Sequence, residues 1–308
     1  MSVRHPAVSW VPPFGRGGLL QKVAVVTDSS ACLGPALAAS NKIEVVPFTL
    51  AFGDTVYRDG MGDPEEFYHL LRGAKTPPTT AAPPPAAFAE GIRRAAANAA
   101  SVLCITLPAN LSSAYSACLK AAEAMRQELP ETPVRCVASK AVAAGQGLIA
   151  LEIARAGARG VDLAAAAVLA ESLAEQVHFF AFLDSLEYLA KGGHVPKATA
   201  WLGGIVGLRL VLTAPNGEVR RITQARSRRA ATERLLTLAG QHNPTGKPIQ
   251  AMIMHASVPT EAQSLLLEMG RRFDCREAHI TQFTPVMGAH SGPGVLGIAF
   301  RVISDGGA

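Results

Sequence analysis

The chain has 308 residues, of which 49% are hydrophobic and 17% are charged, and its formal net charge is +5. This length predicts one large domain or two domains of ordinary size. The mild positive charge permits an anionic ligand but gives no support for nucleic acid binding. No run of about 18 residues is continuously apolar, so the sequence predicts no transmembrane helix. Residues 1–21 lack the apolar segment of a signal peptide and are predicted to form an N-terminal extension.

The cysteine pattern bears on metal binding and on the compartment. The five cysteines are odd in number and widely spaced, and none forms a Cys-x-x-Cys pair. This pattern predicts neither a disulfide framework nor a metal site. Free thiols fit a reducing cytoplasm, and small apolar core residues are the default interpretation of such cysteines.

Strands and helices alternate in the first half of the chain. Apolar, β-branched runs predict strands at residues 22–31, 43–52, 101–107 and 134–139. Helices are predicted after Asp63-Pro64, at about 86–99, from Ser112 or Ser113 onward, in the alanine-rich segment that ends at about 159, and at about 161–176. A proline-rich loop is predicted before residue 86. This alternation predicts a parallel sheet with helices on both faces. Ligands of such sheets lie beyond the carboxyl ends of the strands.

The pattern changes after residue 171. An aromatic strand, helices around a glycine-rich turn and a hairpin at Asn216-Gly217 are followed by strands at 249–257, 275–285 and 294–303. Hairpins mixed with helices predict an α+β domain with a mixed sheet. The predicted organisation is therefore an extension at 1–21, an α/β/α domain at 22–171 and an α+β domain at 172–308.

Several hydroxyl side chains follow predicted strands or begin predicted helices, among them Ser29, Thr80, Ser112 and Ser113. Each alone is typical of a turn or a helix cap. Together, hydroxyls backed by free helix N–H groups suit a carboxylate or a phosphate, and His290 before a Gly-Pro-Gly turn can add a donor. Phosphate-loop, dinucleotide, nucleophile-elbow and His-Glu-x-x-His motifs are absent from the sequence, so no catalytic residue, cofactor or metal is expected.

Six segments in the same order resemble the DegV family, bacterial fatty-acid-binding proteins that serve as the lipid-carrying subunit of fatty acid kinase. The resemblance runs from about Val23 to Val302. The segments are VVTDSS, VVPFTLAFGDTVYRDG, TTAAPPPAAF, LSSAYSA, LEYLAKGGHV and HSGPG.

The resemblance implies two unequal domains with a long-chain fatty acid buried between them. It implies that Thr80, Ser112 and His290 hold the carboxylate, with Ser29 close to the same network and the Ser113 N–H as an added donor. It also implies a separate fatty acid kinase as partner, which would form the acyl phosphate, and no catalysis by this chain. Exchange of such a ligand predicts peripheral contact with a membrane.

The chain departs from the family pattern at Ala81, Ser113, Ala114 and Ala138, and His194 stands where the family has an arginine. The arginine-rich run at 219–234, with Arg226, is a candidate docking face for the kinase or for a phosphate. One alternative is a binder of another anionic lipid without a kinase. The other is a hydrolase with Ser112 as nucleophile and His290 as base, although no carboxylate is evident to orient the histidine.

Overall fold

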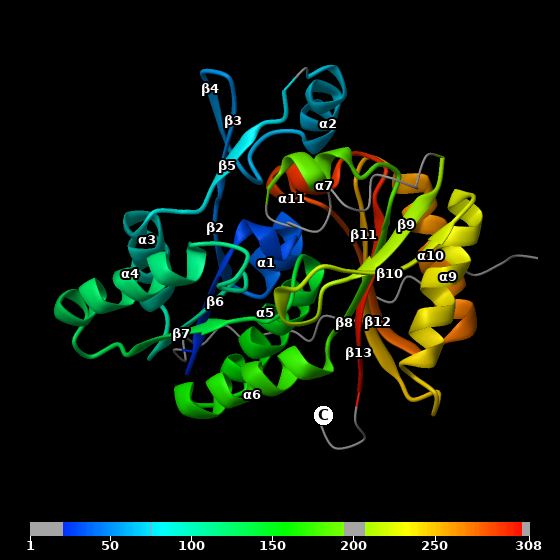
Figure 1. The fold of residues 1–308 in the computed structure, drawn as a ribbon. Helices are drawn as coiled ribbons and strands as arrows, with labels where there is room; N and C mark the ends of the chain where they lie inside the picture. Colours follow the sequence, from blue (N-terminus) through cyan, green and yellow to red (C-terminus); the bar gives the residue numbers. More distant parts are fainter. Residues whose placement is uncertain (1–20, 75, 194–206, 304–308) are drawn as a thin grey trace, which may run out of the picture.

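A computed structural model describes residues 21–74, 76–193 and 207–303 of the chain, and Figure 1 shows two large sheets, with helices packed around them, and one small sheet. The first sheet is parallel, in the order β2-β1-β6-β7. Its strands are β1 (Ala24–Asp28), β2 (Ile43–Val46), β6 (Val102–Thr106) and β7 (Val134–Ala138). Every residue of β1 and β6 is buried, as expected for parallel strands covered on both faces.

Helices cover this sheet as the sequence predicts, and the α/β/α arrangement is confirmed (Figure 1). The helices of this part are α1 (Pro35–Ser40), α2 (Pro64–Gly73), α3 (Pro85–Ala96), α4 (Ala114–Glu128), α5 (Ala144–Ala158) and α6 (Leu163–Gln176). Helix α2 begins as predicted, because the Asp63 side chain accepts a hydrogen bond from the Glu65 N–H at 2.9 Å and Pro64 occupies the first turn.

Two predictions for this half are wrong. The single strand predicted at 43–52 is two strands, β2 and β3 (Thr49–Phe52), in different sheets. Pro47 lies between them and has no N–H to donate to a sheet, which explains the break. The predicted proline-rich loop contains a strand, β5 (Thr79–Ala81), that pairs antiparallel with β3. With β4 (Thr55–Arg58), these strands form a small sheet in the order β4-β3-β5.

The second large sheet has six strands in the order β10-β9-β8-β13-β11-β12. They are β8 (His178–Leu183), β9 (Arg209–Thr213), β10 (Arg220–Ala225), β11 (Ile249–His255), β12 (Cys275–Gln282) and β13 (Leu296–Val302). Strands β11 and β12 are parallel and the other neighbours are antiparallel, so the predicted mixed sheet is confirmed. Helices α9 (Arg228–Gln241) and α10 (Pro259–Arg272) pack together with this sheet in one core.

The hairpin predicted at Asn216-Gly217 joins β9 to β10, but its connection is longer than two residues. Strand β9 ends at Thr213 and β10 begins at Arg220. Asn216 and Gly217 both have positive φ angles, as a hairpin turn of this sequence requires. The turn packs against the loop after β6: a Cβ on Gly217 would lie 2.6 Å from Asn110 Oδ1.

Helix α5 lies between the two large sheets. Of its 15 residues, 12 are buried, which is typical of a helix that is apolar on all sides and covered on all sides. It contacts β1 in the first sheet and β11 and β13 in the second. The boundary at residues 171/172 stays a prediction: it separates the strands of the two sheets in sequence, while one apolar core runs across it.

Close contact between α5 and β1 depends on a missing side chain. A Cβ at position 157 would lie 2.2 Å from the Val23 carbonyl oxygen, so Gly157→Ala forces the helix away from the sheet. We expect this substitution to lower the free energy of unfolding by about 1–3 kcal/mol. Gly270→Ala in α10 is the matched control, because its Cβ would meet no atom within 4 Å. It should raise the free energy of unfolding by about 0.5–1 kcal/mol. Urea denaturation measures both, and equal effects would contradict the account.

Candidate functional site

A cavity of about 430 Å³ lies where the two large sheets and the small sheet meet. This volume falls in the range of small-molecule sites, roughly 300–1,000 Å³. The wall is mainly apolar. Its larger apolar side chains are Phe48, Leu107, Leu111, Val142, Phe179, Leu183, Leu189, Leu212, Val219, Phe283, Val286, Met287 and Val295. Its polar residues are Ser30, Thr80, Ser112, Ser113, His290 and Ser291.

Strand β8 shows how the sequence builds this wall. Side chains of a strand point alternately to opposite faces. Phe179, Ala181 and Leu183 face the cavity. Phe180 and Phe182 face the second core, together with residues of α9 and α10. The aromatic run predicted as one buried strand therefore serves two cores at once.

Thr80 and His290 meet in the cavity wall. The Thr80 Oγ1 lies 2.9 Å from His290 Nε2, although 210 residues separate them in the sequence. Thr80 comes from β5, and His290 comes from helix α11 (Pro285–Ser291). Both were singled out from sequence, and the structure brings them together.

The sequence did not predict helix α11, because the Gly-Pro-Gly after His290 indicated only a tight turn. Pro285 begins the helix, and the Val286 N–H donates to the buried Asp59 carboxylate at 2.9 Å. Gly292 ends it with φ +79°, where a Cβ would lie 2.3 Å from the Tyr188 ring. A backbone with positive φ and no room for a side chain requires glycine. The signal available in the sequence was Thr284-Pro285, a possible helix start.

The His290 ring is held by close packing as well. A Cβ at Gly192, which follows helix α7 (Glu187–Lys191), would lie 2.5 Å from His290 Nδ1. The first glycine of the sequence GGHV therefore lets the backbone approach the imidazole. His194 in the same segment lies outside the described residues.

Ser112 and Ser113 both line the cavity at the start of α4. The Ser112 Oγ accepts a hydrogen bond from the Ala114 N–H at 3.2 Å. Ser113 occupies the N-cap position, and its side chain makes no capping hydrogen bond. The positive end of a 15-residue helix thus lies beside the cavity, a place where an anion is stabilised.

Ser29 is buried but is not among the residues that line the cavity. Its Oγ accepts from the Phe48 N–H at 3.0 Å, and the Ser29 hydroxyl lowers the pKa of the Asp59 carboxyl group. The next residue, Ser30, lines the cavity and was not singled out from sequence. Its hydroxyl donates to Asp28.

Arg226 follows β10, is exposed and does not line the cavity. Another arginine of the same run has a structural role. Arg228 donates to the Gly294 carbonyl at 2.8 Å and pairs with Asp184 and Glu261. It therefore fixes the turn that follows His290, and its charge is already compensated.

Two buried carboxyl groups lie close to the site. Burial raises the pKa of Asp28, whose carboxylate accepts from the Leu107 N–H at 2.9 Å. Burial also raises the pKa of Asp59 to about 6, against hydrogen bonds from Ser29 and Val286 that lower it. In the sequence, Asp59 is distinguished only as part of the segment VVPFTLAFGDTVYRDG that resembles the family. Its role depends on burial, which a sequence does not show.

Fold and site together define an α/β protein of two large sheets and one small sheet with a mostly apolar cavity, whose wall carries hydroxyls, a helix N-terminus and one imidazole. The chain belongs to the DegV family, a family of uncharacterised proteins whose sequence pattern matches residues 22–302. Among the described residues, no helix is both long and apolar enough to cross a membrane.

Relatives match almost the whole chain. A DegV domain-containing protein of Streptomyces coelicolor is 30% identical over 278 residues, which are 90% of this chain and 97% of that protein. A fatty-acid-binding DegV family protein from Thermus thermophilus has a structure with a TM-score of 0.82 and 27% identity, covering 92% of this chain and 100% of its own. DegV of Bacillus subtilis, a fatty acid binding protein, has a structure with a TM-score of 0.81 and 24% identity, covering 92% of this chain and 100% of its own, and it shows the same fold.

Asp59 should make stability depend on pH. Its pKa rises from 3.8 to about 6 on folding, so the folded state is penalised when Asp59 is charged. The penalty is absent below about pH 4, grows as pH rises to 6 and is constant above, reaching about 3 kcal/mol. Asp59→Asn keeps an oxygen acceptor for Val286 and removes the charge. Relative to wild type, it should gain stability between pH 4 and pH 7 in urea denaturation.

Asp54→Asn on the exposed turn between β3 and β4 controls for the loss of one negative charge. A stability difference between Asp59→Asn and wild type that is the same at pH 4 and pH 7 would show that Asp59 does not titrate in this window.

Proposed function

We propose that this protein binds a long-chain fatty acid in the cavity and holds its carboxylate at Thr80 and His290. The observation that carries the proposal is the Thr80–His290 pair, 2.9 Å apart, in the wall of a mainly apolar cavity of about 430 Å³. A carboxylate removed from water needs hydrogen-bond donors, because an unpaired buried charge is very costly. The apolar wall suits the tail, since each buried CH₂ contributes about 0.8 kcal/mol.

Each polar residue has a defined part in this proposal. The Thr80 hydroxyl and the His290 imidazole donate to the carboxylate. The Ser112 hydroxyl and the Ser113 N–H contribute from the start of α4, where the helix dipole favours an anion. Ser29 acts indirectly. Its Oγ accepts from the Phe48 N–H just before β3, and its hydroxyl lowers the pKa of Asp59, whose carboxylate accepts from the Val286 N–H at the start of α11.

We further propose that the bound carboxylate is presented to a separate fatty acid kinase, which forms the acyl phosphate in the cytoplasm. The chain carries no nucleotide-binding motif in its sequence, so ATP would come from the partner. Arg226 is one of the exposed arginines of the basic run offered to that partner. A hydrolase finds less support: His290 Nε2 pairs with Thr80, while Ser112 contacts the Ala114 N–H.

Contact with a membrane during lipid exchange belongs to the same proposal. Strand β4 and the segment after it expose apolar side chains: Val56 is 65% exposed and Met61 is 68% exposed. Strand β3 also pairs with β5, which carries Thr80 (Figure 1). An apolar, exposed edge that leads to the cavity suits the entry of an acyl chain from a bilayer, and transfer from lipid vesicles tests it.

Thr80→Val should weaken oleate or palmitate binding by about 10- to 150-fold, because a hydrogen bond to a charged group contributes about 1.5–3 kcal/mol. Thr79→Val is the matched control in the same strand, because Thr79 is exposed and does not line the cavity. Titration calorimetry on delipidated protein measures both, and His290→Ala should weaken binding at least as much as Thr80→Val. Mass spectrometry that finds no fatty acid in the purified protein, together with no binding of added fatty acid, would reject the proposal.

A separate assay tests the proposed presentation of the fatty acid to a kinase. With a fatty acid kinase subunit and ATP, the loaded wild-type protein should yield acyl phosphate, and Arg226→Glu should lower the rate without changing fatty acid affinity. Binding of the fatty acid with no turnover would identify a carrier that works without a kinase.

A further inference from the structure

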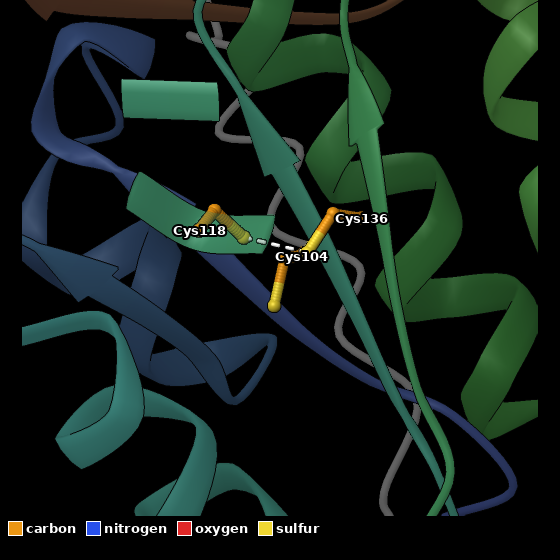
Figure 2. Close-up of side chains that lie close together, drawn as sticks. All are labelled: Cys104, Cys118 and Cys136. Atoms are coloured by element: carbon orange, nitrogen blue, oxygen red, sulfur yellow. Dashed lines mark hydrogen bonds between the residues drawn. The ribbon is translucent and has the colours of Figure 1, made fainter. Parts of the chain in front are cut away.

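Three of the five cysteines converge at one place in the first sheet, although the sequence spacing predicts no metal site. Cys104 on β6 is in register with Cys136 on the neighbouring strand β7. Cys118 comes from α4, which packs on both strands. Figure 2 shows the three side chains together, with the sulfur atoms of Cys118 and Cys136 joined by a dashed line. All three sulfur atoms lie within 4.8 Å of one another.

The three sulfur atoms form a group of interacting free thiols. The closest pair, Cys118 and Cys136, is 2.8 Å apart, well beyond the roughly 2.05 Å of a disulfide bond. Cys104 and Cys118 are fully buried, and Cys136 is half-buried. Hydrogen bonds from the Cys104 and Cys118 thiols lower the pKa of Cys136.

We propose that Cys104, Cys118 and Cys136 form a three-thiolate binding site for a thiophilic divalent metal ion of the zinc class. Zinc–sulfur bonds are about 2.3 Å long, so three sulfurs around one ion lie about 4 Å apart. The Cys118–Cys136 pair, at 2.8 Å, is closer than this value, and rotation of either side chain about its Cα–Cβ bond widens it, while all three sulfur atoms already lie within 4.8 Å of one another. Soft sulfur ligands select zinc-class ions over magnesium or calcium.

Charge also favours a divalent ion. Three buried thiolates without a cation would be very costly, and a divalent ion reduces their net charge to −1. Binding releases the protons that the thiols still carry. The described residues offer no fourth histidine, cysteine or carboxylate within the group, so water completes the coordination on the half-buried side of Cys136.

The site would fasten α4 to the sheet beside the cavity. Cys118 lies four residues after Ala114, where α4 begins, and Ser112 and Ser113 in the cavity wall come immediately before. A bound ion would therefore restrain the helix whose N-terminus faces the cavity. The cysteine site is defined by the geometry of the three thiols and is independent of the ligand that the cavity binds.

The test uses Co²⁺ as a spectroscopic probe of the reduced, full-length protein after treatment with a chelator and without oxygen. We expect one Co²⁺ per chain, with thiolate-to-metal charge-transfer bands that disappear when Zn²⁺ displaces it. Cys136→Ser should abolish the bands. Cys275→Ser is the matched control, because Cys275 is equally half-buried and lies outside the group, and it should leave the bands unchanged.

Excess Zn²⁺ should also raise the melting temperature of the wild type and of Cys275→Ser, but not of Cys136→Ser, because an ion that binds only the folded state stabilises it. Circular dichroism checks that Cys136→Ser is folded. The proposal is overturned if the reduced wild type gives no charge-transfer bands, or if folded Cys136→Ser keeps them. A Cys118–Cys136 disulfide in protein isolated without oxygen would equally overturn it.

Discussion

The burial of helix α5 on all sides is the constraint on which the rest of the structure depends. A helix with 12 of its 15 residues buried cannot lie on the surface of one sheet, so it needs a second layer. The first sheet supplies one cover through the close contact of Gly157 with Val23, and the second sheet supplies the other. The cavity lies just beyond the carboxyl ends of β1 and β6, which contribute Ser30 and Leu107, and against strand β8 of the second sheet.

The positioning of His290 follows from a ring of contacts around the short helix α11. Asp59 accepts from the first turn, Tyr68 donates to the Phe283 carbonyl just before the helix, and Gly292 packs on Tyr188 just after it. Arg228 holds the Gly294 carbonyl. A helix of seven residues is not stable by itself, so these contacts from four other segments supply its order. The imidazole is thereby fixed before any ligand arrives, which reduces the entropy lost on binding.

Sequence reasoning succeeded where local pattern and burial agree. The buried strands around Val25 and Ile105, the capped helix at Asp63 and the mixed second sheet all follow from periodicity and turn residues. Four of the proposed carboxylate ligands, Thr80, Ser112, Ser113 and His290, line one cavity; the fifth, Ser29, does not. Family resemblance contributed those positions, because no local rule connects a threonine in a proline-rich segment with a histidine 210 residues later.

The features that could not be predicted depend on tertiary contacts, which a sequence does not display. Strand β5 exists because Thr79–Ala81 pairs with β3, and its own proline-rich context argues for a loop. The cysteine group also depends on a tertiary contact. Its members are widely spaced in the sequence, and Cys104 lies beside Cys136 only because β6 and β7 pair in parallel. Asp59 became relevant only when burial and its bond to Val286 were visible.

The hydrogen bond between Thr80 and His290 also has a consequence for synthesis of the protein. Its partners are 210 residues apart, so the polar part of the cavity wall cannot form until the chain is nearly complete. At ordinary translation rates, Thr80 leaves the ribosome about 10–40 s before His290. During that interval the apolar residues that follow β1 and β6 lack their final cover. The nascent chain therefore exposes the apolar wall of its cavity before His290 can complete the polar part.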